Sequence, residues 1–294
     1  MVVILSREQN HRRLSDLLAE ISRSKLMKLC RSKKALAIPV TFLILFVSTL
    51  GIIAVTYYYS IERIDARSVT LKDSMAQQDM SSLDDALSSV LCQPGSSRTV
   101  QINDYGGELL VQPSTNLLLV NVTDDDGISA TIFNSSVGEV LYELPYSETA
   151  NTGLFLKGDS RSIVNQSGSA KTQLYITNGQ EHVEIALHYR PIVSAATYTN
   201  EDNTTINDVR VYLVNLNSSQ DIDSMGEVPL VISCTNVEDI VTTYNVSNQT
   251  STLNISASLD GVQGQVSVPI SGGTSAEVNL ELIISDVKIE TWMR

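Results

Sequence analysis

Side chains that commonly carry catalytic or metal-binding chemistry are scarce in this sequence of 294 residues. Its three histidines and three cysteines form no CxxC pair, no HExxH helix and no nucleophile elbow. His182 and His188 share a face of one predicted strand, but six residues of extended chain separate them by about 20 Å. One metal ion cannot bind both, so we interpret them as structural histidines. The sequence predicts neither an enzyme nor a metal or cofactor site.

Two glycine-containing segments match ion-binding loops only in part. Asp124–Gly127 offers carboxylate oxygens to Ca²⁺ but lacks the spaced ligands and the terminal glutamate of a calcium loop, so a hairpin turn is the preferred interpretation. Gly272 and Gly273 are followed neither by a helix nor by the lysine of a phosphate-binding loop. No phosphate site is expected there.

The charged residues divide the chain into two unlike parts. Residues 1–35 hold nine Lys or Arg against three acidic residues, whereas residues 36–294 hold 11 bases and 30 acids. A basic segment followed by an acidic body is typical of a membrane-topology signal. The isoelectric point near 4.6 argues against nucleic-acid binding, which requires a basic face.

Between these parts lies an apolar segment that predicts a transmembrane helix over residues 36–59. Its 24 residues carry no formal charge, and at about 1.5 Å per residue they span a hydrocarbon core of about 30 Å. Bases precede it and Tyr57–Tyr59 end it, which predicts a cytoplasmic leader over 1–35 and an extracellular body over 60–294. The alternative is a cleaved secretory signal, whose apolar region would be shorter.

The leader itself has apolar residues at helical spacing, among them Leu14, Leu17 and Leu18. Such a basic helix could lie on the inner leaflet, with membrane lipid as its partner. The alternative is a solvated leader that only sets topology.

The predicted helix continues past the membrane as an amphipathic extension over residues 60–95. No proline or glycine occurs from Ile52 to Gln93, and Pro94 with Gly95 then ends the pattern. Apolar residues recur three or four positions apart, including Ile61, Ile64, Leu71, Met75, Leu83, Leu87 and Val90. We expect this stripe to pack on its own head domain or on the equivalent helix of a neighbour in a homo- or hetero-oligomer.

The sequence pattern of residues 96–294 is typical of a β domain, which we expect to be extracellular. Eleven short runs, the first at 99–102 and the last at 276–284, are β-branched or alternating and are separated by turn residues. Asp104–Gly107, Asp124–Gly127 and Asp260–Gly261 are the most explicit turns. The expected fold class is mainly β: a β-sandwich head on a long N-terminal helix. The head is either one large sandwich or two stacked ones, with a sub-boundary near 194–207.

Eight N-x-[ST] triplets lie beyond the predicted span and support its outside placement. These candidate N-glycosylation sites are Asn121, Asn134, Asn165, Asn203, Asn217, Asn245, Asn248 and Asn254. The alternative interpretation is that they are simply polar residues of turns and strands.

The cysteines fit the same topology. Cys30 lies on the cytoplasmic side, as a free thiol or a lipid-attachment site. Cys92 and Cys234 lie outside and form a candidate disulfide between the helix end and the head. Two unpaired thiols are the alternative, because sequence spacing does not establish proximity.

The start of the apolar segment resembles a known processing site. Lys33, Lys34 and Ala35 precede an apolar helix with an early proline, Pro39, and the segment QPGSSRTVQINDYGGELLVQP follows the helix. Both features are similar to archaeal type IV pilin-like surface proteins, whose N-termini are class III prepilin-like. The resemblance covers roughly residues 31–113. It implies cleavage between Ala35 and Leu36 by a prepilin-peptidase-like protease, helical stems bundled in a filament core, and a β-rich head.

Two hypotheses of function follow. The first is a non-enzymatic structural or adhesive pilin-like subunit of an archaeal surface filament. The second is an uncleaved single-pass membrane protein whose extracellular head binds a ligand or a partner in the cell envelope.

Overall fold

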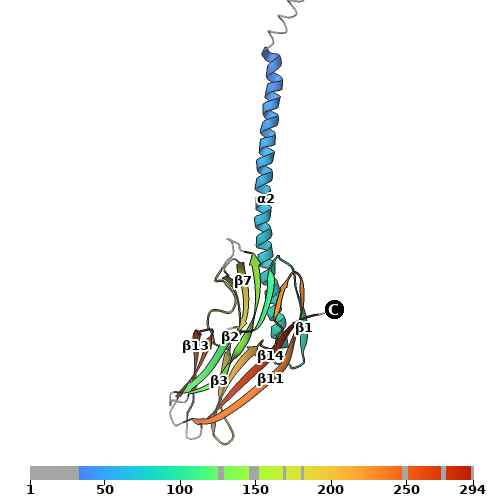
Figure 1. Cartoon of the computed structure of the whole chain (residues 1–294). Helices are drawn as coiled ribbons and strands as arrows, with labels where there is room; N and C mark the ends of the chain where they lie inside the picture. The colour runs from blue at the N-terminus through green and yellow to red at the C-terminus, as the bar shows by residue number, and fades with distance from the viewer. Residues whose placement is uncertain are drawn as a thin grey trace, which may run out of the picture. The chain divides into compact units, whose positions relative to one another are not determined.

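The computed structural model describes residues 33–124, 129–145, 152–167, 170–179, 182–246, 251–272 and 276–292. These residues form one helix, α2 (Lys33–Val90), and fourteen strands (Figure 1). Most of the predicted leader, the turn residues 125–127, Gly273 and Asn248 lie outside the described residues. The chain divides into two compact units, Met1–Arg67 and Ser68–Arg294.

Helix α2 confirms the long N-terminal helix that the sequence predicts. Hydroxyls in its apolar part donate to the preceding turn, as Thr56 Oγ1 does to the carbonyl of Ile52 at 2.8 Å, so they add no unpaired polar group. The helix ends at Val90, earlier than the predicted residue 95. It ends there because Cys92 and Gly95 have φ angles of 61° and 81°, in the left-handed region, and Pro94 lies between them.

The described part of the first unit consists of α2 alone. Its large apolar side chains from Val40 to Tyr59 are exposed. Among the described residues, α2 is the one helix long and apolar enough to cross a membrane, and the chain is therefore consistent with a single-pass membrane protein.

The second unit contains two β-sheets. The six-stranded sheet has the order β1 (Ser97–Ile102), β11 (Val228–Val246), β14 (Ala276–Thr291), β9 (Thr205–Asn215), β8 (Ile192–Thr199), β5 (Val164–Asn165). The eight-stranded sheet has the order β13 (Val262–Ile270), β12 (Ser251–Leu259), β2 (Glu108–Asp124), β3 (Ser129–Pro145), β7 (His182–Tyr189), β6 (Thr172–Asn178), β4 (Phe155–Lys157), and β10 (Ile222–Met225) also pairs with β2. Neighbouring strands are antiparallel except for the parallel pairs β9 with β14 and β5 with β8.

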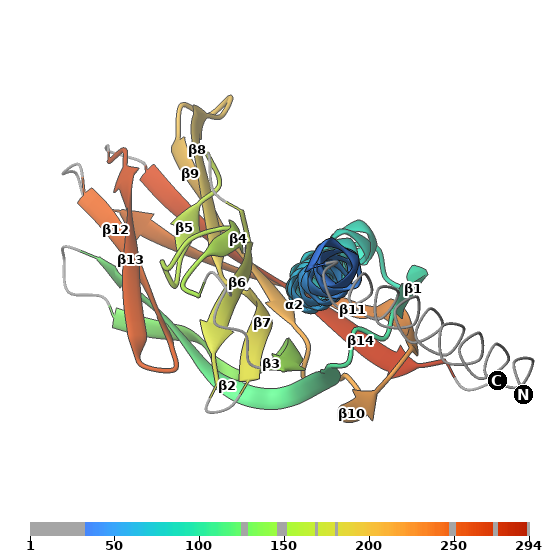
Figure 2. The same cartoon turned by 90° about the horizontal axis from the view of Figure 1, so that it is seen from above.

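The first of two cores contains the C-terminal part of α2. Its buried residues recur at helical spacing and are Ala76, Met80, Leu83, Leu87 and Val90. They pack with residues of both sheets, such as Ile185 of β7 and Ile232 of β11, and Figure 2 shows α2 between these two strands. The distal half of the predicted stripe thus packs on its own head, and each fully buried Leu or Met contributes about 1.5–3 kcal/mol.

The second core forms where the two sheets face each other directly. Val120 and Ile255 of the eight-stranded sheet pack there with Val211 and Val278 of the six-stranded sheet. Strands β2 and β14 contribute residues to both cores, so the described residues of the head form one sandwich and not two stacked ones. The stretch 194–207, considered as a sub-boundary, lies in the β8–β9 hairpin of one sheet.

Two of the predicted turns are confirmed. Asp260 and Gly261, with φ angles of 47° and 84°, connect β12 to β13 in a two-residue hairpin. Gly106 has a φ angle of 82°, and its amide donates to Asp104 Oδ1 at 2.7 Å in the turn before β2.

Candidate functional site

Three glutamates form a row across adjacent strands of the eight-stranded sheet. Glu108 of β2 lies opposite Glu143 of β3, which lies opposite Glu184 of β7. Their neighbours Tyr142 and Ile185 are buried in the first core, so the glutamates lie on the outer face of the sheet. Like charges placed directly opposite each other destabilise a sheet unless something compensates them.

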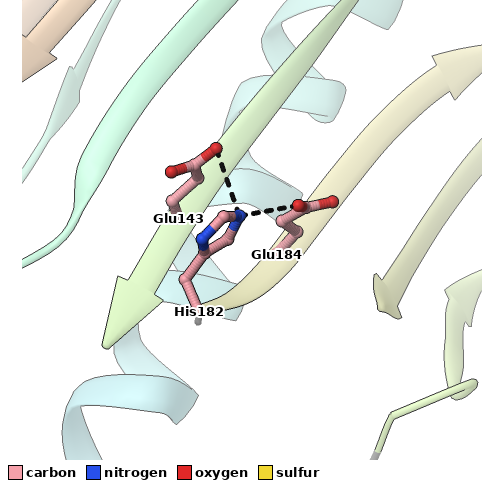
Figure 3. Close-up of side chains that lie close together, drawn as sticks. All are labelled: Glu143, His182 and Glu184. Atoms are coloured by element: carbon pink, nitrogen blue, oxygen red, sulfur yellow. Dashed lines mark hydrogen bonds and ion pairs between the residues drawn. The ribbon is translucent and has the colours of Figure 1, made fainter. Parts of the chain in front are cut away.

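His182 is the side chain that contacts two glutamates of this row. Its Nε2 lies 2.7 Å from Glu184 Oε1 and 3.4 Å from Glu143 Oε1 (Figure 3). One donor atom from each of the three residues lies within 4.8 Å of the others, and all three residues are half-buried. A histidine with two carboxylates is a donor set that could hold a metal ion.

Gly179 lies against His182, the first residue of β7. The amide of Gly179 donates to the carbonyl of His182 at 2.9 Å. A Cβ atom at residue 179 would lie 2.1 Å from His182 Nε2, so only glycine leaves room for the ring in this position. Gly179 therefore leaves space for the imidazole, which contacts its two carboxylate partners there.

An open pocket of about 360 Å³ adjoins this cluster, and its charged or titratable lining residues are Asp104, Glu108, Glu143 and His182. The pKa of Glu108 is raised, first by its hydrogen bond with the Asp223 carboxyl group and further by the charges of Asp223 and Glu143. The pocket therefore concentrates negative charge and favours a cation over an anion.

His188 lies on the same face of β7 and has separate partners. Its Nε2 lies 2.9 Å from Glu139 Oε2, and its Nδ1 lies 3.2 Å from Asn116 Nδ2. The ring of Tyr175 stacks on it at 5.5 Å between centroids. Burial alone would raise the pKa of Glu139, but its hydrogen bond to His188 and the charge of His188 hold that pKa below its usual value. Both ring nitrogens of His188 are occupied, which agrees with a structural role.

A buried carboxylate connects α2 to the eight-stranded sheet. Asp84 Oδ1 accepts hydrogen bonds from Thr172 Oγ1 and Tyr189 Oη, each at 2.8 Å, and Asp84 Oδ2 lies 2.9 Å from Lys157 Nζ. Lys157 also contacts the exposed Asp85 at 2.7 Å. Burial raises the pKa of Tyr189 well above its usual value, and Asp84 raises it further, so the hydroxyl remains a donor. This network fixes the helix in the head.

The sequence correctly predicted that His182 and His188 share one face of a strand, but it missed their carboxylate partners. Glu184 is two residues from His182, so strand periodicity alone puts both on one face. Glu143 and Glu139 lie on β3, about 40 and 50 residues earlier, and only the pairing register brings them to β7. The interpretation of His182 as purely structural did not anticipate this donor set.

The two predicted disulfide partners are free thiols in this structure. Cys92 Sγ lies 3.7 Å from Ser285 Oγ, and Cys234 Sγ donates to the carbonyl of Asn236 at 3.5 Å. The chain nevertheless brings the two cysteines to one region, because the backbone of Cys234 is hydrogen-bonded to Gly95 and Ser96. Their oxidation stays a prediction.

The candidate glycosylation sites differ in accessibility. The exposed asparagines are Asn134, Asn165, Asn203, Asn217 and Asn245. Asn121 and Asn254 are half-buried, and their side-chain oxygens accept hydrogen bonds from Thr131 and from Gln265 and Ser267. We expect modification to favour the exposed group.

Two features of α2 bear on assembly. Ala35 and Leu36, the candidate processing site, lie within the first turn of the helix. Beyond the predicted span, α2 has an exposed stripe that we define as Ile61, Ile64, Leu71 and Met75, each between 41% and 64% exposed. Ala76, the residue after Met75, is the first apolar residue of α2 that is buried in the head, and at about 100° per residue it lies on a different face of the helix from Met75.

Comparison with known proteins identified no relative. No family model, no curated protein and no solved structure matches this chain.

Proposed function

We propose that this protein is a membrane-anchored, non-enzymatic surface subunit of the pilin-like kind, which assembles with neighbouring subunits through its N-terminal helix. The change of burial along α2 carries the proposal. From Ala76 onward one face of the helix is buried in the head, whereas the exposed stripe before it, which lies about 100° around the helix from that face, is uncovered. A helical segment with an uncovered apolar face is marginal in water and gains stability by packing on another helix.

Helix α2 is longer than a membrane anchor requires, which leaves a segment for assembly. About 20 residues suffice to cross the hydrocarbon core, and residues 36–59 supply them. Residues 60–75 are then neither needed for the membrane nor buried in the head. Equivalent segments of neighbouring subunits supply a matching apolar surface, as stems do in the filaments of the family that the N-terminus resembles.

The charge distribution and the processing motif support a membrane topology for the protein. The basic leader is cytoplasmic, the acidic head is extracellular, and cleavage between Ala35 and Leu36 by a prepilin-peptidase-like protease removes the leader. The exposed sequons lie on the head and are therefore available for glycosylation outside the cell.

Assembly is tested by making the exposed stripe polar. In the double variant Ile64→Gln/Leu71→Gln, each copy loses two apolar contacts worth about 1.5–3 kcal/mol each when fully buried. We expect surface filaments in electron micrographs, and large oligomers in detergent sedimentation, to disappear while the far-UV circular dichroism of the head is retained. Glu62→Gln is the matched control, since it changes an exposed polar residue on the same helix segment. Filaments that persist in the double variant would refute assembly through the stripe.

A second candidate function is favoured by the acidic row and its pocket. An uncleaved, single-pass protein would use its head to bind a cationic ligand or a cell-envelope partner at Glu108, Glu143 and Glu184. In that case the stripe variant would leave surface display and head binding intact, and no filaments would be found with the unaltered protein.

A further inference from the structure

We propose that Glu143, His182 and Glu184 form a binding site for one divalent transition-metal ion, of which Zn²⁺ is the representative, on the outer face of the eight-stranded sheet. The site lies wholly within the head, and the argument for it does not depend on how the protein assembles. It rests on three properties: the convergence of the donor atoms, the charge of the row, and the types of donor.

The donor atoms converge closely enough for direct coordination. Metal–donor distances of about 2.0–2.2 Å place the donors of a tetrahedral Zn²⁺ site about 3.4 Å apart. His182 Nε2 lies 2.7 Å from Glu184 Oε1 and 3.4 Å from Glu143 Oε1, and all three donor atoms lie within 4.8 Å of one another. A shift of the carboxylate oxygens by about an ångström, through rotation of the two glutamate side chains, would make room for an ion without movement of the strands.

One histidine does not balance the negative charge of the glutamate row. Among the described residues, the ion pairs of Glu143 and Glu184 are all with His182. Glu108, opposite Glu143 in the same row, adds a third carboxyl group. The single Nε2 of His182 faces both carboxylates, whereas a dication between the three residues balances both charges and accepts the imidazole lone pair.

The donor types select the class of metal. An imidazole nitrogen suits Zn²⁺ and its transition-metal neighbours, while Ca²⁺ and Mg²⁺ prefer sites composed of oxygen atoms. Three protein ligands also leave a position for water or a further ligand. Glu143 and His182 line the open pocket, so that position is accessible from solvent.

The scaffold holds the ligands in place before any metal binds. The two glutamates are directly paired on adjacent antiparallel strands, and His182, the first residue of β7, accepts a hydrogen bond at its carbonyl from the amide of Gly179. Sites built on paired strands keep their geometry better than sites on loops.

The test is isothermal titration of the full-length protein in detergent with ZnCl₂, in a buffer free of phosphate and chelators. We expect saturable binding of one Zn²⁺ per chain. His182→Asn, Glu143→Gln and Glu184→Gln should each weaken it by about a hundredfold or more, because each removes one of three ligands. Ca²⁺ and Mg²⁺ in excess should not compete.

His188→Gln is the matched control, because His188 lies on the same face of the same strand and also contacts a glutamate. It should bind Zn²⁺ within about threefold of the unaltered protein. Thermal melts without metal show which variants are folded, and Co²⁺ supplies a second readout, since its visible bands report coordination by the protein and should be lost in His182→Asn. The absence of saturable Zn²⁺ binding, equal affinity in folded His182→Asn, or an equal loss in His188→Gln would each overturn the proposal.

Discussion

Asp84 is the residue whose removal should most weaken the attachment of α2 to the head. Its carboxylate is buried, with 3% of the residue exposed, and accepts hydrogen bonds from Thr172, Tyr189 and Lys157. In Asp84→Ala, the hydroxyls of Thr172 and Tyr189 lose their acceptor in a buried environment, which costs about 1–3 kcal/mol for each group. Lys157 keeps Asp85 as a partner. The expected loss is therefore about 3–5 kcal/mol, the range found when a buried ion pair is broken.

Asp85→Ala is the matched control for this prediction. Asp85 contacts the same Lys157 at 2.7 Å, but its side chain is 75% exposed, so its removal should cost no more than about 1 kcal/mol. Asp84→Asn should fall between the two, because the amide oxygen still accepts from the hydroxyls while its NH₂ group faces the lysine ammonium.

The assay is thermal unfolding of the full-length protein in detergent, followed by circular dichroism in the β-sheet region. For a folded unit of this size, each kcal/mol lowers Tm by about 2–4 °C, so Asp84→Ala should melt about 10 °C below the unaltered protein. If Asp84→Ala and Asp85→Ala melt within 2 °C of each other, the network does not hold the helix in the head.

Three further predictions concern the outer face and its neighbours. The pKa of Glu139 is lowered in the folded protein. The ionised Glu139 side chain therefore contributes its full stabilisation above the unfolded pKa of about 4.3, and this stabilisation is lost as the pH falls through the lower folded pKa. Glu139→Gln should therefore be less stable than the unaltered protein at pH 7, and the gap should narrow below about pH 4 in melts across pH; a constant gap would contradict the assignment. Arg190 has a side chain that is 0% exposed and donates to Asp159 and to the carbonyls of Ala170 and Arg161, so Arg190→Ala should lose about 3–5 kcal/mol in the same melts. Arg161→Ala, which removes an exposed partner of the same Asp159, should change Tm little. Gly179→Ala places a methyl group against His182 and Glu184 and should weaken Zn²⁺ binding by about tenfold or more at nearly unchanged Tm; unaltered affinity would mean that the ring is not where the metal binds.

The long helix was predictable because its signals are local. An uncharged run, an apolar stripe and a terminal Pro-Gly pair predicted α2 almost to its observed end, and the Asp260–Gly261 turn was equally explicit. The lengths of the strands were harder to predict from the sequence. Two short runs on either side of Pro113 are one strand, β2, since the proline lies where the pairing with β3 shifts register and no ladder N–H is required. The segment 194–207, considered as a sub-boundary, is mostly a hairpin, and residues 195–199 of its first strand are exposed on both faces.

Only part of the candidate site could be predicted from the sequence, because the rest depends on how distant strands pair. The shared face of His182 and Glu184 follows from the two-residue period of a strand, but the position of Glu143 depends on which strand pairs with β7 and in which register. That register is set by the burial of Tyr142, Leu144, Val183 and Ile185 in the core with α2. The metal-type donor set is therefore a property of the assembled sheet and not of any local segment.

The proposed function depends most directly on the fate of the basic leader, because the pilin-like account requires the working protein to begin at its helix. The decisive measurement is N-terminal sequencing of the mature protein isolated from its native cell envelope. The account predicts a chain that begins at Leu36, after cleavage following Ala35. A chain that begins at Met1 or Val2 would contradict it and would favour an uncleaved single-pass protein.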